Sequence, residues 1–200
     1  MLDDLEPAVA RSFERALTQL RAAGAHIEEI ALTPIVELAG LQSSGGFAAP
    51  ESWAWHRPLL ANHSHEYDPR VLSRIRRGEA TSAADYLDLH AARRAWISAV
   101  GPCIQRFDAL LSPTLPLVAP PIAALLTDDA AFYATNARIL RNPSVVNFLD
   151  GCALSMPCHS PGEFPVGMMV WGAAMQDDTV LDVSLAIEAV LNAAHFKSEG

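Results

Sequence analysis

Apolar side chains near the N-terminus recur at the spacing of one helical face. Asp3 or Asp4 can cap the first turn, Pro7 is tolerated inside it, and Gly24 can end the helix. The spacing therefore predicts an amphipathic helix whose inner stripe faces a core. The stripe consists of Leu5, Val9, Phe13, Ala16, Leu17 and Leu20.

The segment after this helix changes pattern. Residues 26–32 are short and partly β-branched, and Pro34 follows them, so we expect a strand there. A helix, a turn and a strand in this order are typical of an α/β protein. Residues 41–67 mix glycine, tryptophan and histidine without a clear period, and no regular structure is predicted for them.

A second long helix is predicted after Thr81. Ser82 and Asp85 have the spacing of a capping box, in which each side chain bonds the other residue's backbone N–H. Pro102 should kink or split this helix, because proline removes a backbone donor and clashes with the preceding turn. One face of this helix is traced by Tyr86, Leu89, Arg93, Trp96, Ile97, Val100, Ile104 and Phe107.

Three short apolar runs in the second half of the chain predict strands. Residues 108–113 end at a proline, and residues 153–156 and 166–171 are joined by the turn-rich residues 157–162, so the last two strands should be neighbours. Residues 179–194 then carry an apolar helical stripe that would pack on the sheet. With no internal repeat and no solvated linker, residues 1–200 are expected to form one domain or part of one.

Composition narrows the class of protein. The chain has 200 residues, of which 50% are hydrophobic and 18% charged, which excludes disorder and allows a sizeable core. Fourteen Lys and Arg against 23 Asp and Glu give a formal net charge of -9. Phosphate binding needs clustered basic side chains, so this charge argues against a nucleic-acid partner.

Neither a membrane span nor a targeting segment is expected. The longest uncharged run, residues 109–127, contains Pro113, Pro116, Pro120 and Pro121, which prevent a regular spanning helix. Acidic residues stand at the start of the chain, where a signal peptide would be basic. Three scattered cysteines do not make a disulfide framework. We therefore expect a soluble, cytoplasmic protein.

Residues 43–46, with the sequence Ser-Ser-Gly-Gly, are the first candidate for chemistry. A serine on a glycine-rich turn can be exposed and close to backbone donors, but it needs a general base to become a nucleophile. The only lysine of the chain is Lys197, close to the C-terminus, so a lysine base is not expected to serve this serine. A loop without a catalytic role is the favoured interpretation.

Histidines and cysteines offer two further candidates. His56, His63, His65 and Glu66 could in principle hold a metal, but histidines in a polar loop are usually solvated. The cysteines Cys152 and Cys158, the latter followed by His159, could supply a thiolate. Cysteines beside apolar strands are more often inert, so neither role is favoured.

The only basic concentration is a group of four arginines. Arg70, Arg74, Arg76 and Arg77 could bind a carboxylate or another anion. A solvated helical turn whose arginines pair with nearby acids is the simpler interpretation. Both interpretations, the anion site and the solvated helical turn, allow one arginine to face a pocket.

Several segments form an ordered series of motifs. The most specific part consists of Asn147, Gly151, the Ser-Met-Pro of residues 155–157, residues 164–169 and Gly172, with Asp177, Asp178 and Leu181 beyond; the other segments are residues 5–9 with 20–25 and residues 107–114 with Ala119 and Pro120. In their order and spacing, these segments resemble the C-terminal half of the amidase signature family, whose members hydrolyse amides or transfer their nitrogen.

The resemblance implies an α/β fold with a mixed central sheet flanked by helices, incomplete in this chain. It implies hydrolysis of carboxylic amides to acid and ammonia, without cofactor or metal. The family's two serines and lysine lie upstream of the matched region, so residues 1–200 would be the C-terminal portion of one amidase domain, inactive alone. Tyr67, Arg74, Thr114 and Asn147 lie on segments that would line the substrate pocket.

We expect such a segment to bind another chain, because an incomplete sheet exposes backbone hydrogen-bond donors and acceptors along its edge. We expect a complementary N-terminal chain or self-association, and a small-molecule amide as substrate of the intact enzyme. Two alternatives remain open at this stage. One is a non-catalytic binding or assembly module, and the other is an independent hydrolase that uses histidine and cysteine or a metal.

Overall fold

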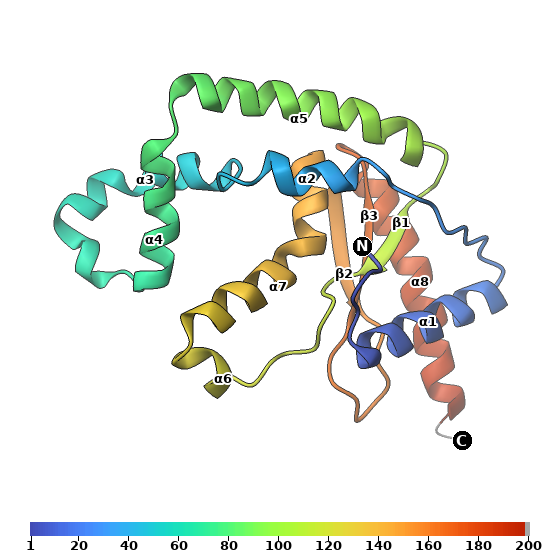
Figure 1. The fold of residues 1–200 in the computed structure, drawn as a ribbon. Coiled ribbons are helices and arrows are strands. Elements are labelled where there is room, and N and C mark those ends of the chain that lie inside the picture. The colour runs from blue at the N-terminus through green and yellow to red at the C-terminus, as the bar shows by residue number, and fades with distance from the viewer. Residues whose placement is uncertain (199–200) are drawn as a thin grey trace. The chain divides into compact units, whose positions relative to one another are not determined.

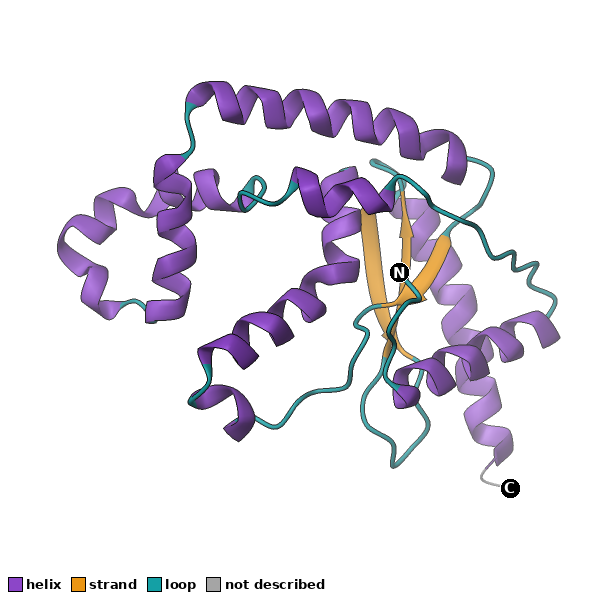
Figure 2. Cartoon of the chain, viewed as in Figure 1, coloured by secondary structure: helices purple, strands orange, loops and turns teal. Residues whose placement is uncertain are grey.

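The structure is a computed structural model that describes residues 1–198. It divides into two compact units, one made of Met1–Ala31 and Gly101–Gly200 and the other of Leu32–Val100. The elements are coloured along the chain in Figure 1 and by type in Figure 2. Along the chain, the first unit contains α1 (Pro7–Ala22), the end of α5, β1 (Leu110–Pro113), α6 (Ala123–Leu126), α7 (Asp129–Leu149), β2 (Cys152–Pro157), β3 (Gly167–Gly172) and α8 (Asp177–Ser198).

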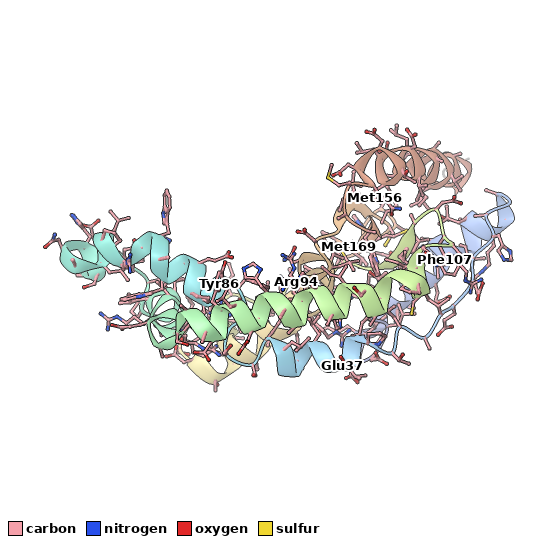
Figure 3. All side chains as sticks on the ribbon, turned by 90° about the horizontal axis from the view of Figure 1, so that it is seen from above. Glu37, Tyr86, Arg94, Phe107, Met156 and Met169 are labelled. Carbon is pink, nitrogen blue, oxygen red and sulfur yellow. The ribbon has the colours of Figure 1, made fainter. Side chains whose placement is uncertain are left out.

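The first unit is built on a three-stranded antiparallel sheet with the order β1-β3-β2. The central strand pairs Met169 with Ser112 of β1 on one side and with Ser155 of β2 on the other. Alternate residues of a strand point to opposite faces. Met156 and Met169, both labelled in Figure 3, therefore belong to opposite faces of the sheet.

The main core lies between one face of this sheet and the helices α1 and α8. Met168 and Val170 of β3 are fully buried there, each with 0% of its surface exposed. The side chains that α1 and α8 contribute follow the stripes expected from the sequence. They are Val9, Phe13, Ala16, Leu17 and Leu20 from α1, and Val180, Ile187 and Leu191 from α8.

A buried asparagine joins α7 to the sheet and to the N-terminal segment. Asn142 is 0% exposed, and its Nδ2 donates to the carbonyl of Pro113 at 2.7 Å and to that of Met1 at 3.1 Å. On the same helix, Arg141 Nη2 donates to the carbonyl of Asp3 at 2.6 Å. These bonds fix the segment before α1 against the end of β1.

The loop between β2 and β3 is tied to α1 by an ion pair. Arg15 Nη2 lies 2.6 Å from Glu163 Oε2, and the same carboxylate accepts from the backbone N–H of Ser160 at 2.8 Å. The hydrogen bond from Arg15, followed by that from Ser160, lowers the pKa of Glu163 to about 2. The ionised carboxylate therefore holds the loop on the helix.

The second unit is helical. Its elements are α2 (Ile35–Leu41), α3 (Ala48–His63), the 3-10 turns η1 (Ser64–Glu66) and η2 (Gly78–Ala80), α4 (Pro69–Arg77) and most of α5 (Ala83–Ile104). The capping box at the start of α5 is confirmed, because Ser82 N donates to Asp85 Oδ2 at 2.9 Å and Asp85 N donates to Ser82 Oγ at 3.1 Å. The hydrogen bonds from the Ser82 side chain and backbone lower the pKa of Asp85.

Most of the predicted elements are confirmed, and so is the expected combination of helices with a sheet. The strand predicted over residues 26–32 is wrong, because the segment has no regular structure and pairs with no described strand. Pro102 does not split α5, since the helix continues to Ile104. The expectation of no regular structure over residues 41–67 is also wrong, because this segment contains the whole of α3 and η1. No element was predicted where α7 lies. No helix among the described residues is long and apolar enough to cross a membrane.

Replacing Asn142 with alanine should destabilise the first unit. The substitution removes both hydrogen bonds and leaves the buried Pro113 carbonyl without its donor, so we expect a loss of about 2 kcal/mol in the free energy of unfolding. Urea unfolding of the variant measures this. The matched control is Asn192→Ala on the exposed side of α8, for which we expect a change within about 0.5 kcal/mol. Equal effects of the two substitutions would contradict the assignment.

The Arg15–Glu163 pair predicts a dependence of stability on pH. The folded-state pKa of Glu163 lies below its ordinary value, so its contribution is present above that ordinary value of 4.5 and is lost as the pH falls towards about 2. Wild type should therefore exceed Glu163→Gln in stability at pH 6, and the difference should shrink between pH 4.5 and pH 2. A difference that stays constant over this range would refute the role of the charge.

Candidate functional site

Two hydroxyl groups meet on one face of the sheet in the first unit. Thr114 follows β1 directly, and its Oγ1 lies 2.6 Å from the Oγ of Ser155 on β2. The backbone N–H of Thr114 donates to the carbonyl of Gly167 at 2.8 Å, which fixes the position of the threonine. One hydroxyl donates to the other, and the pair keeps a further O–H donor and lone pairs for a ligand.

The hydroxyl pair depends on the absence of a side chain at position 167. The central strand separates Thr114 from Ser155, and a Cβ at Gly167 would lie 2.6 Å from Ser155 Oγ and 2.8 Å from Thr114 Oγ1. Both distances are far below van der Waals contact. Ser155 is exposed and Thr114 half-buried, so the pair is open to solvent.

Asn147 lies in the last turn of α7 and is exposed. Its role as a substrate-binding residue stays a prediction. The asparagine that supports the end of β1 is Asn142, five positions earlier, and the sequence analysis did not single it out. Only the hydrogen bonds made across the fold distinguish the two.

Tyr67 and Arg74 belong to the second unit. Tyr67 lies just before α4, and its hydroxyl lies 2.8 Å from Nδ1 of His56 on α3, with the two rings edge to face at 5.5 Å. Asp68 caps α4 by accepting from the N–H of Arg70 at 2.7 Å and from that of Val71 at 3.3 Å. The run of arginines is therefore helical, as predicted. Both Tyr67 and Arg74 are half-buried.

An aromatic cluster holds the start of α3 against α5 in this unit. The rings of Phe47, Tyr86 and His90 pack edge to face, with centroids 4.7 to 5.8 Å apart, and Arg93 lies over Phe47 at 5.2 Å. Tyr86, labelled in Figure 3, donates its hydroxyl to Glu51 at 2.9 Å. That bond, together with a smaller effect of desolvation, raises the pKa of Tyr86.

The Ser-Ser-Gly-Gly segment is a turn between α2 and α3, as the sequence favoured. Gly45 and Gly46 have φ angles of 107° and 58°, a region that suits glycine. Arg77 Nη2 donates to the carbonyl of Ser43 at 3.0 Å and ties the turn to α4.

The histidines and cysteines make contacts that suit structural roles. His63 Nδ1 pairs with Glu66 at 2.8 Å, while His56 is bonded to Tyr67. Within residues 1–198, no group of three or more potential metal ligands comes together. Cys158 is buried, and desolvation raises the pKa of its thiol to about 11, which disfavours the thiolate that a nucleophile needs.

The sequence of this chain is similar to those of amidases. The amidase family model matches residues 1–181. The chain belongs to the amidase signature family. Among related proteins, a 2-amino-5-chloromuconic acid deaminase of Comamonas testosteroni is 28% identical over 194 residues, which cover 96% of this chain and 42% of that protein. An amidase of Pseudomonas putida is 30% identical over 188 residues, which cover 93% of this chain and 40% of the relative.

Solved structures agree on the fold. A crystal structure of an amidase superimposes with a TM-score of 0.74 at 26% identity, covering 93% of this chain and 42% of that one. Kluyveromyces lactis allophanate hydrolase gives a TM-score of 0.81 at 24% identity, covering 93% and 30%. The chain thus spans about 40% of the length of the curated relatives it matches, which is consistent with a C-terminal segment of an amidase.

Adding a methyl group at position 167 should disrupt the hydroxyl pair. We expect Gly167→Ala to lower the free energy of unfolding by about 1–3 kcal/mol, because the new Cβ must displace Ser155 or Thr114. The double variant Gly167→Ala/Ser155→Ala should recover part of this loss. Thermal unfolding measures both effects. Gly101→Ala is the control, since a Cβ there meets nothing within 4 Å; a Gly167→Ala variant as stable as this control would disprove the close approach.

Proposed function

We propose that this chain is the C-terminal part of an amidase that hydrolyses carboxylic amides to the acid and ammonia. The family match over residues 1–181, which spans only about 40% of the related proteins, is the observation that carries this proposal. The chain supplies one flank of the sheet and part of the pocket, while the serine nucleophile, the second serine and the lysine base come from the part of the fold that it does not contain.

The lysine count supports a catalytic centre outside this chain. Lys197 is the only lysine, and it lies beyond the region that the family model matches. The turn that contains Ser44 is held by Arg77, whose fixed positive charge cannot take a proton from a serine. A chain without a general base for Ser44 is expected to release no ammonia.

Tyr67, Arg74, Thr114 and Asn147 are the proposed substrate-binding residues. The phenol of Tyr67 and the hydroxyl pair of Thr114 and Ser155 can donate to an amide carbonyl or accept from its N–H, and Arg74 suits a carboxylate on the substrate. The relatives include the 2-amino-5-chloromuconic acid deaminase and a subunit of a glutamyl-tRNA(Gln) amidotransferase. Cleavage of a carbon–nitrogen bond is common to the chemistry these names describe.

A complementary chain is the proposed partner. The name of the amidotransferase relative describes one chain of a larger enzyme, and an incomplete amidase fold needs the remaining strands and helices to close its pocket. The partner would carry the catalytic serines and lysine.

Ammonia release tests the proposed function. The purified chain should release none above the blank from a panel of aliphatic and aromatic amides, because it has no serine with a base. Ser44→Ala should behave in the same way as wild type. Release that disappears in Ser44→Ala would show a serine hydrolase within this chain and refute the proposal. Release that survives Ser44→Ala but is abolished by a chelator or by thiol alkylation would point to the metal or cysteine alternative.

A further inference from the structure

The two outer strands of the sheet, β1 and β2, differ in how many of their backbone N–H and carbonyl groups have hydrogen-bond partners. In an antiparallel pair, only every second opposed residue exchanges hydrogen bonds with its partner strand. Cys158 N donates to the carbonyl of Val166 at 2.9 Å, directly after the opposed pair Pro157 and Gly167. Counting back along β2, the backbones of Cys152, Leu154 and Met156 face β3, and those of the alternate residues Ala153, Ser155 and Pro157 face away from it.

The position of proline agrees with this register. Pro157 has no N–H, so it costs no hydrogen bond where the backbone faces away from β3. The N–H and carbonyl groups of Ala153 and Ser155 face the open edge, and in the described part of the chain they bond to no other segment. Both residues are exposed. Strand β2 therefore presents a free edge.

The opposite edge of the sheet is partly occupied. Thr114 N donates to the carbonyl of Gly167, so the backbone of Pro113 faces away from β3. The Pro113 carbonyl accepts from the buried Asn142, and Ser112 is 2% exposed. Among the described residues of β1, Leu111 alone presents both a backbone N–H and a carbonyl along this short edge.

The lack of charged side chains on β2 is a second indication that its edge is covered in the assembled protein. Edge strands of finished sheets are usually protected by charged side chains, a bulge or a central proline. The sequence of β2, Cys-Ala-Leu-Ser-Met-Pro, contains no charged residue, and its only proline stands at the end. An edge strand without charged side chains, whose outward-facing residues Ala153, Ser155 and Pro157 are exposed, is typical of a strand that has a neighbour in the assembled protein.

We propose that the free edge of β2 is the surface on which the missing part of the amidase fold docks, by adding a strand along Ala153–Ser155–Pro157. This inference rests on the proposed function, because the occupant is the part of an amidase that this chain lacks. The relatives are more than twice as long as the matched region, since this chain covers 42% and 40% of them, so the intact fold has ample further chain to supply that strand. Main-chain hydrogen bonds would give the affinity, as in other cases of strand addition.

The test combines complex formation with hydrogen exchange. The full chain is produced together with the portion of the Pseudomonas putida amidase that it does not cover, and separately with the corresponding portion of the Comamonas testosteroni deaminase. We expect a complex with at least one of them. The N–H groups of Ala153 and Ser155 should exchange quickly in the chain alone and be protected in the complex.

Substitutions at Ala153 make the test specific for the edge. Ala153→Pro removes an edge donor without removing a hydrogen bond to β3, so the variant should fold with an unchanged circular dichroism spectrum and bind the partner roughly tenfold more weakly. Ala153→Val is the matched control, because it retains the N–H and suits a strand. It should bind as wild type does.

Several results would overturn the proposal. They are the absence of a complex with either portion, a complex in which the β2 amides stay unprotected, and equal binding by the proline and valine variants. A homodimer that protects β2 and does not yield to the added portion would assign the edge to a second copy instead. Because binding and exchange are measured without turnover, a protected complex that releases no ammonia would count against the proposed function only.

Discussion

The central strand β3 imposes the constraint on which the first unit depends. It pairs with β1 on one side and with β2 on the other, and five of its six residues are buried. Met168 and Val170 need the core formed with α1 and α8, while Gly167 must lack a side chain so that Thr114 and Ser155 can meet across it. A strand buried on both faces is uniformly apolar, as the sequence Gly-Met-Met-Val-Trp-Gly is.

Polar contacts hold the other segments of the first unit around this sheet. Asn142 satisfies the carbonyl of Pro113 at the end of β1 and anchors the N-terminal segment. The Arg15–Glu163 pair holds the β2–β3 loop on α1. Within the sheet of the described residues, the edge of β2 is the one that leaves a row of backbone groups without partners. A unit that is closed on the core side and open along one strand is what a part of a larger sheet should look like.

The candidate binding residues form two sets, Thr114 and Asn147 in the first unit and Tyr67 and Arg74 in the second. In the first unit, a glycine and two hydroxyls form a polar spot on a sheet. In the second, Tyr67 is held by His56 at the start of a capped, arginine-rich helix. The amidase family model matches residues 1–181, so both sets lie within the region that the family shares.

The sequence alone determined the elements whose signals are local. The stripe of Val9, Phe13 and Leu17 fixes α1, the Ser82–Asp85 box fixes the start of α5, and apolar runs bounded by proline and glycine fix the three strands. The sequence also contains the motifs of the family. The strand predicted over residues 26–32 was wrong, because an extended segment becomes a strand only if another strand pairs with it. The meeting of Thr114 with Ser155, the buried role of Asn142 rather than Asn147 and the free edge of β2 depend on register, and register is set by contacts between residues far apart in the chain.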